Sequence, residues 1–123
     1  MGIMILAKGI SPVMEFGTSK FKEFQNCIVD SLYGQKGVKL YNNFSSLNNN
    51  ELAEWKKLSN SSINKLLLLE NRTEISTVSL KKILEILKGV KIQSTKVTEI
   101  KDYMIKCIEH CLKNKDKLII LIR

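Results

Sequence analysis

The sequence predicts a single α+β domain over residues 1–123, in which a small sheet pairs the N- and C-terminal strands and packs against three to five helices. Residues 118–122 form an unbroken apolar run, rich in β-branched side chains and too short for a stable helix. Such a run is typical of a strand covered on both faces. Residues 3–6 form a comparable run at the other end of the chain. Isolated strands leave backbone groups unpaired, so we expect these two to pair.

The first third of the chain is expected to hold a strand, a loop and a helix. Residues 3–7 form the strand, and residues 8–17 form a loop that contains the only proline. Thr18 or Ser19 can cap the helix, and Gly34 suits the left-handed position just past its end. The apolar stripe of this helix consists of Phe21, Phe24, Cys27, Ile28 and Leu32.

The pattern is less regular in the middle of the chain. Residues 38–44 allow either a short strand or one helical turn, and residues 45–50 indicate a polar loop. Asn49 or Asn50 then caps a short helix. Its apolar side consists of Leu52, Trp55 and Leu58. This spacing favours a core position for Trp55, and the alternative is a surface on which a base stacks.

Residues 63–69 contain four consecutive leucines, and periodicity cannot separate a buried helical turn from a strand there. We favour a short helix that is capped by Ser61 or Ser62. Residues 70–74 are predicted to form a polar turn before the next helix.

Two longer helices and a strand complete the predicted fold. Ser76 caps the first of these helices and Gly89 ends it. Its apolar stripe consists of Val78, Leu80, Ile83, Leu84 and Leu87. The second helix starts near Thr95 and leads into the strand at residues 118–122. Its stripe consists of Val97, Ile100, Met104, Cys107, Ile108, Cys111 and Leu112. We expect the helices starting near Ser19, Thr77 and Thr95 to cover the sheet.

The chain is basic, with 20 Lys and Arg against 12 Asp and Glu and a formal net charge of +8. Residues 77–123 hold eleven basic and five acidic side chains, so they carry +6 of this total. The asymmetry indicates an anionic partner, which could be nucleic acid, a nucleotide or an acidic protein face. The alternative is that these lysines only solvate the surface of a chain rich in Lys, Asn and Ile.

Cysteine count and hydropathy indicate the cellular setting. Three cysteines are an odd number, so a complete set of intrachain disulfides is excluded. The sequence shows neither a signal peptide nor an apolar run of about 18 residues. We therefore expect a reducing, cytoplasmic setting without membrane association.

Gly17, Thr18, Ser19 and Lys20 form the first candidate site, because they start a helix that follows a strand and a loop. Free backbone N–H groups and the positive end of the helix dipole meet at such a place and bind phosphate or carboxylate. The segment lacks the spacing of a P-loop, and the alternative is an ordinary helix cap.

A second candidate is the basic surface formed by Arg72, Lys81, Lys82, Lys88 and Lys91. We expect Arg72 to matter most, since a guanidinium beside a helix start can clamp a phosphate with two parallel hydrogen bonds. The predicted anion-binding residues are Gly17, Thr18, Ser19, Lys20, Arg72, Ser76 and Thr77.

The cysteines raise the question of a metal. Cys107 and Cys111 lie four residues apart on one helical stripe, where Cys27 and His110 could join them around zinc. However, His110 projects toward another flank of the helix, and structural zinc sites usually draw ligands from short Cys-x-x-Cys loops. Buried free thiols are favoured, and we expect neither a metal nor another cofactor.

Three segments resemble a family of small uncharacterised proteins from phages and prophages of Gram-positive bacteria. They are Phe16-Gly17-Thr18-Ser19-Lys20-Phe21-Lys22-Glu23-Phe24, Leu66 to Leu69 with the turn up to Glu74-Ile75-Ser76, and Glu109-His110-Cys111-Leu112-Lys113-Asn114-Lys115-Asp116-Lys117-Leu118-Ile119. In that family the polar turn resembles His-Ser-Asp-Cys-Asp-Gly, whereas here the matching residues are Leu68-Leu69-Glu70-Asn71-Arg72-Thr73. The turn has lost acidity and gained an arginine, which favours anions over metals. The resemblance implies a phage setting inside a host cell.

These observations favour a non-enzymatic binding protein. The single histidine and the scattered carboxylates form no catalytic pair that the sequence reveals. We expect a phage counter-defence protein that sequesters a phosphate-bearing, nucleotide-like host signal or masks an acidic host protein. The alternative is a nucleic-acid-binding regulator, although no helix-turn-helix, RNP-like or zinc-finger pattern is present. The sequence leaves a homo-oligomer open.

Overall fold

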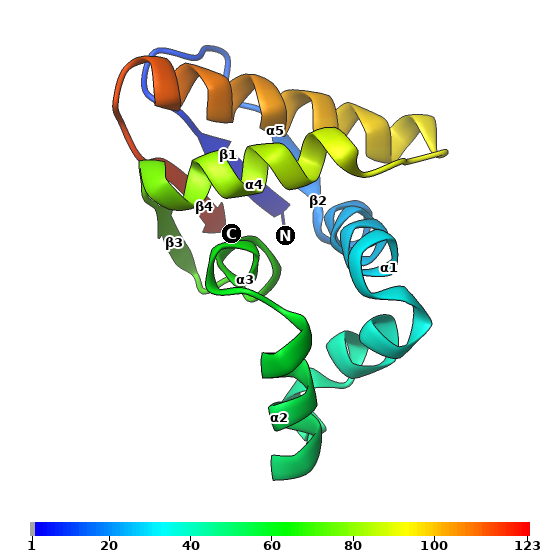
Figure 1. The fold of residues 1–123 in the computed structure, drawn as a ribbon. Coiled ribbons are helices and arrows are strands. Elements are labelled where there is room, and N and C mark those ends of the chain that lie inside the picture. The colour runs from blue at the N-terminus through cyan, green and yellow to red at the C-terminus, as the bar shows by residue number, and fades with distance from the viewer. Residues whose placement is uncertain (1) are drawn as a thin grey trace.

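The structure is a computed structural model that describes residues 2–123 (Figure 1). The described residues form four strands, five α-helices and one 3₁₀ helix. In chain order these are β1 (Gly2–Leu6), β2 (Glu15–Gly17), α1 (Thr18–Asn42), the 3₁₀ helix Phe44–Ser46, α2 (Asn49–Leu58), α3 (Ser61–Leu67), β3 (Arg72–Ile75), α4 (Thr77–Gly89), α5 (Thr95–Lys113) and β4 (Leu118–Ile122).

The sheet confirms the predicted α+β fold and the pairing of the terminal strands. Its strand order is β2-β1-β4-β3, and each neighbouring pair is antiparallel. In the central pair Ile3 lies opposite Ile122 and Ile5 lies opposite Ile120. The backbone N–H of Arg123 donates to the carbonyl of Gly2 at 2.9 Å, so the two ends of the described chain lie side by side (Figure 1).

The prediction that β4 is covered on both faces is wrong. Leu118 and Ile120 are fully buried under the helices, whereas Ile119 and Leu121 point to the other face and are only partly buried. Strand residues alternate between faces, so the apolar side chains in even and odd positions meet different surroundings. The sheet therefore has one face in the core and one open face.

Helices α4 and α5 lie side by side on the core face of the sheet (Figure 1). The predicted α5 stripe is confirmed, because its members are buried except for Leu112, which is half-buried. In α4 the predicted stripe is wrong at Val78, which is 69% exposed because it lies two residues before the buried Leu80 and so faces another side of the helix. None of the helices formed by residues 2–123 combines the length and the hydropathy that a bilayer crossing requires.

Helix α1 changes direction at Gly34 instead of ending there. The φ of Gly34 is +70°, a left-handed value that a residue with a Cβ rarely adopts, and the helix continues to Asn42. The uncertain residues 38–44 are therefore mostly helical. The kink carries Tyr41 back toward the body of the protein, where it is buried.

Trp55 anchors α2, which projects away from the sheet in Figure 1. Its indole is 2% exposed and contacts three aromatic rings, so the core position is confirmed. Tyr41 stacks on it with centroids 5.8 Å apart, while Tyr33 and Phe44 meet it edge to face.

Two edge strands and several helix starts differ from the predictions. β2 lies inside the predicted loop 8–17, and β3 occupies most of the predicted turn 70–74. Both strands are short and polar, and pairing with β1 and β4 rather than local hydropathy defines them.

The N-caps are Gly17 instead of Thr18 or Ser19, Asn48 instead of Asn49 or Asn50, and Asn60 instead of Ser61 or Ser62. The predicted cap position Ser76 and end at Gly89 are confirmed.

Candidate functional site

The start of α1 is open to a ligand. Gly17 ends β2 opposite Gly2 and also occupies the N-cap position of α1. No side chain among residues 2–123 caps this end of the helix. The first turn of a helix has backbone N–H groups without intrahelical partners, and it carries the positive end of the helix dipole. The predicted positions therefore present donors, although Thr18 and Ser19 lie in the first turn and do not cap it.

Thr18 and Ser19 line a surface hollow of about 450 Å³, which we call the α1 hollow. Its lining comes from both terminal strands, both halves of α1, the end of α3 and the segment just after it. It consists of Ile3, Thr18, Ser19, Lys22, Gln25, Tyr41, Leu67, Leu69 and Ile122. The volume falls within the range of small-molecule sites, which are mostly apolar with a few placed polar groups. The hollow thus combines an apolar wall with a helix N-terminus.

Lys22 supplies the positive charge of the α1 hollow. It follows Thr18 by four residues, so both side chains lie on one face of α1. Its Nζ lies 3.9 Å from the centre of the Tyr41 ring, and it forms no ion pair with any carboxylate of residues 2–123. Partial burial of the ammonium lowers the pKa of Lys22 from its usual value. An ammonium without an ion-pair partner favours the approach of an anion.

Gln25 and Tyr41 shape the wall of the hollow by binding the end of α3. The Gln25 amide donates to the carbonyl of Leu66 at 3.0 Å, and the Tyr41 hydroxyl donates to the carbonyl of Leu67 at 2.7 Å. These bonds satisfy carbonyls that the end of a helix leaves without partners. Burial raises the pKa of Tyr41, so its hydroxyl remains a donor at neutral pH. Both side chains are therefore held in place before any ligand arrives.

Lys20 points away from the hollow, contrary to its predicted role. Its Nζ pairs with the Glu99 carboxylate of α5 at 3.4 Å. Lys20 precedes Lys22 by two residues, and positions two apart face different sides of a helix. The helix therefore presents Lys22, which the sequence prediction missed, and directs Lys20 toward α5.

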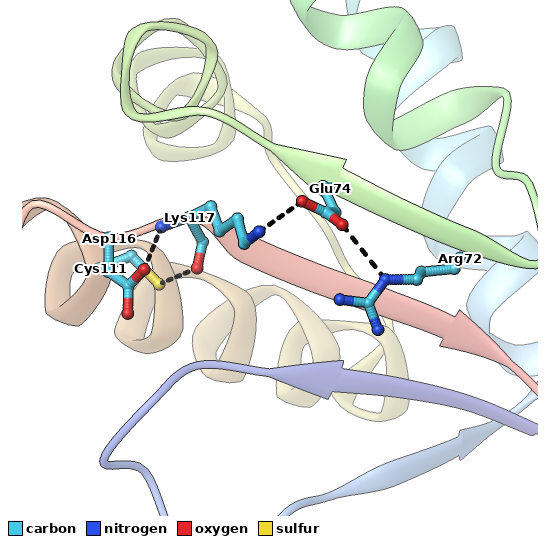
Figure 2. Close-up of polar contacts among 5 residues, drawn as sticks. All are labelled: Arg72, Glu74, Cys111, Asp116 and Lys117. Atoms are coloured by element: carbon cyan, nitrogen blue, oxygen red, sulfur yellow. Dashed lines mark hydrogen bonds and ion pairs between the residues drawn. The ribbon is translucent and has the colours of Figure 1, made fainter.

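Arg72 lies in an ion-pair network on the open face of the sheet (Figure 2). Its Nε is 3.2 Å from one carboxylate oxygen of Glu74, and the other oxygen accepts from Lys117 at 2.6 Å. Hydrogen bonds from Lys117 and then Arg72 lower the pKa of Glu74. The Arg72 guanidinium thus already contacts a carboxylate of its own chain. Phosphate binding there would have to compete with Glu74.

The structure separates Arg72 from the start of α1. Arg72 is in β3 and Gly17 is in β2, which are the two opposite edge strands of the four-stranded sheet. Three interstrand steps of about 4.8 Å, and an offset of two residues along the strands between Gly17 and the row of Arg72, place them roughly 16 Å apart. Ser76 and Thr77 follow β3 at the far end of the sheet, beside the start of β4. The predicted residues consequently form three separate places, of which only the start of α1 borders the α1 hollow.

The lysines of the predicted basic surface lie on α4 and just after it. Lys81, Lys82, Lys88 and Lys91 are all exposed, and Lys88 lies 3.5 Å from Glu109 of α5. Exposed lysines of this kind attract anions over a distance without forming a defined site.

The cysteines are placed as buried or half-buried thiols. Cys107 and Cys111 are buried and Cys27 is half-buried, and all three are free. Burial raises the pKa of Cys107, and it raises the pKa of Cys111 to about 11. The His110 ring donates from Nε2 to the carbonyl of Lys8 at 2.8 Å. Within residues 2–123, no group of three or more His, Cys, Asp and Glu side chains is placed to hold a metal ion.

Replacing Cys107 by alanine should lower the free energy of unfolding by on the order of 1 kcal/mol. The cause is lost packing, because the side chain is fully buried beneath the sheet. Thermal unfolding with and without a chelator checks this, and we expect the chelator to change neither chain. Stoichiometric zinc by elemental analysis, or a chelator effect that Cys107→Ala removes, would contradict it.

None of the known protein families, curated proteins and solved structures compared with this chain matches it. The geometry of the α1 hollow and the charge of the chain are therefore the features that bear on its function.

Proposed function

We propose that this protein binds and sequesters a phosphate-bearing, nucleotide-like small molecule in the α1 hollow without catalysing a reaction. The observation that carries the proposal is the convergence of the uncapped α1 N-terminus and the unpaired Lys22 on one hollow with an apolar wall. Backbone donors and an ammonium suit a phosphate. Ile3, Leu69 and Ile122 suit the apolar faces of a base or sugar.

The proposed setting is phage counter-defence in the cytoplasm of a host cell. The resemblance to small phage proteins supports the phage setting, and a nucleotide signal of host immunity has the chemistry that the hollow suits. Masking an acidic host protein is the other form of this proposal, supported by the net charge of +8. A nucleotide-sized concave site favours the small molecule.

Lys22→Ala should weaken nucleotide binding by about 1.5 to 3 kcal/mol, which is the usual value of a hydrogen bond to a charged group. The matched control is Lys20→Ala. It removes the same charge from the same helix, but from a side chain that points to Glu99, so its effect should stay below about 1 kcal/mol. Calorimetric titration with a panel of cyclic and linear nucleotides measures both variants.

Equal losses in Lys22→Ala and Lys20→Ala would indicate diffuse charge and would contradict the site. A nucleotide absorbance released when the purified protein is heat-denatured would identify the ligand directly. Binding to duplex DNA with a steep salt dependence, in place of nucleotide binding, would instead favour the nucleic-acid-binding regulator.

A further inference from the structure

The open face of the sheet carries apolar side chains that do not belong to the core. Met4 and Leu6 of β1 and Ile119 and Leu121 of β4 point to this face and are partly exposed. None of the four is part of the hydrophobic core cluster or of the partly buried set packed against it. Figure 2 looks onto this face and shows the strands in front of the helices. These four residues and their charged neighbours make up the open face.

The strand register arranges the open face in rows. One row runs from Glu15 through Met4 and Leu121 to Arg72, because each of these residues lies opposite the next. The next row places Leu6 beside Ile119 and Ile119 beside Glu74. An apolar block of four side chains thus has an acid at one edge and a base at the other edge of the same row.

The charge of the open face differs from that of the whole protein. Its rim holds two carboxylates and three cations, a net of +1, whereas the chain carries +8. These rim residues are Glu15, Arg72, Glu74, Lys117 and Arg123. Most of the positive charge therefore lies elsewhere. An anionic partner would find little attraction here, and a second copy of this basic chain would meet little repulsion.

We propose that the open face is the interface of a symmetric homodimer, in which two sheets pack face to face. A two-fold axis parallel to the strands keeps each row in register and exchanges its edges. Glu15 of one copy then faces Arg72 of the other, and Met4 faces Leu121. The apolar blocks cover each other, and two intermolecular ion pairs flank them.

The small area of the open face indicates that this dimer is weak. Four strands about 4.8 Å apart and five residues of about 3.4 Å each give a face of roughly 19 by 17 Å, or about 300 Å². A standard stable interface buries about 800 Å² per partner. The dimer is consequently expected to be weak, and it must be measured at high concentration.

Sedimentation analysis of the full chain from about 10 µM to about 1 mM tests the proposal. The wild-type chain should shift from monomer to dimer over this range. Leu121→Lys should raise the dissociation constant at least tenfold, whereas Val78→Lys, at an exposed apolar position on α4, should leave it unchanged. A wild-type chain that stays monomeric at the highest concentration, or equal effects of the two variants, would overturn the dimer.

A charge exchange tests the arrangement without a change in the apolar block. Glu15→Arg and Arg72→Glu each place like charges opposite each other in their own homodimers, so each should weaken dimerisation about tenfold. In an equimolar mixture, the introduced arginine of one variant faces the introduced glutamate of the other, and the native Arg72 of the first faces the native Glu15 of the second. Association should therefore return to the wild-type level.

Melting temperatures show that each charge variant is folded. A mixture that associates no better than the separate variants would overturn the proposed interface.

Discussion

Removal of residues 118–123 is expected to abolish cooperative folding. These residues include β4, which is central in the sheet and pairs with both β1 and β3. Without β4 the N-terminal strand keeps only the three-residue β2 as a partner, and β3 keeps none. Short two-strand pairs are marginal in water. Thermal unfolding followed by circular dichroism should show no sigmoidal transition for the truncated chain.

Single substitutions separate the burial of β4 from its backbone pairing. Ile120 is fully buried beneath the helices, so Ile120→Ala should lower the free energy of unfolding by about 2 to 5 kcal/mol. Val78→Ala removes methyl groups that are 69% exposed and should change it by less than about 0.5 kcal/mol. Equal effects, or a truncated chain that melts like the full one, would contradict the central role of β4.

Trp55→Ala should lower the free energy of unfolding by about 3 to 5 kcal/mol, the usual range for a large buried aromatic residue. The indole is the contact point of Tyr33, Tyr41 and Phe44, so its removal takes the packing from three rings at once. Urea unfolding followed by far-ultraviolet circular dichroism measures the loss.

Trp55→Phe is the matched control for the same position. The indole Nε1 is buried and has no hydrogen-bond partner among residues 2–123, so losing this N–H should cost little. We expect the phenylalanine variant to retain most of the stability. Trp55→Ala should also weaken nucleotide binding, because it removes the ring on which Tyr41 stacks beside the α1 hollow. Equal stabilities for the two variants would show that the aromatic packing contributes little.

Central elements could be predicted from the sequence because their signals are local and strong. The apolar runs of β1 and β4 identify strands that need a partner, and the α5 stripe identifies a buried face. The edge strands gave no such signal. β2 has Phe16 as its single buried residue, and β3 alternates Arg72 and Glu74 with buried Thr73 and Ile75 over only four positions.

Of the candidate site, only the first turn of α1 could be predicted from the sequence. Gly17 and the hydroxyls after it mark a helix start, which is a local feature. The contributions of Lys22 and Tyr41 depend on the Gly34 kink and on the position of α3, and neither follows from local periodicity. A signal for Lys22 was present, since it shares a helical face with Thr18. The sequence predicts a turn at Arg72. In the strand that forms instead, Arg72 shares a face with Glu74, two residues away, which explains their pairing.

The strand order also determines when this protein can fold during synthesis. β1 and β3 are synthesised before β4, but they are not neighbours in the sheet, and β4 lies between them and pairs with both. Until β4 has left the ribosome, the nascent chain can form helices and the β1–β2 hairpin but cannot close its core. Pairing between the ends of a chain also requires the largest loop closure, which slows folding. β1 therefore exposes its apolar side until β4 has been synthesised, which favours chaperone binding during that interval.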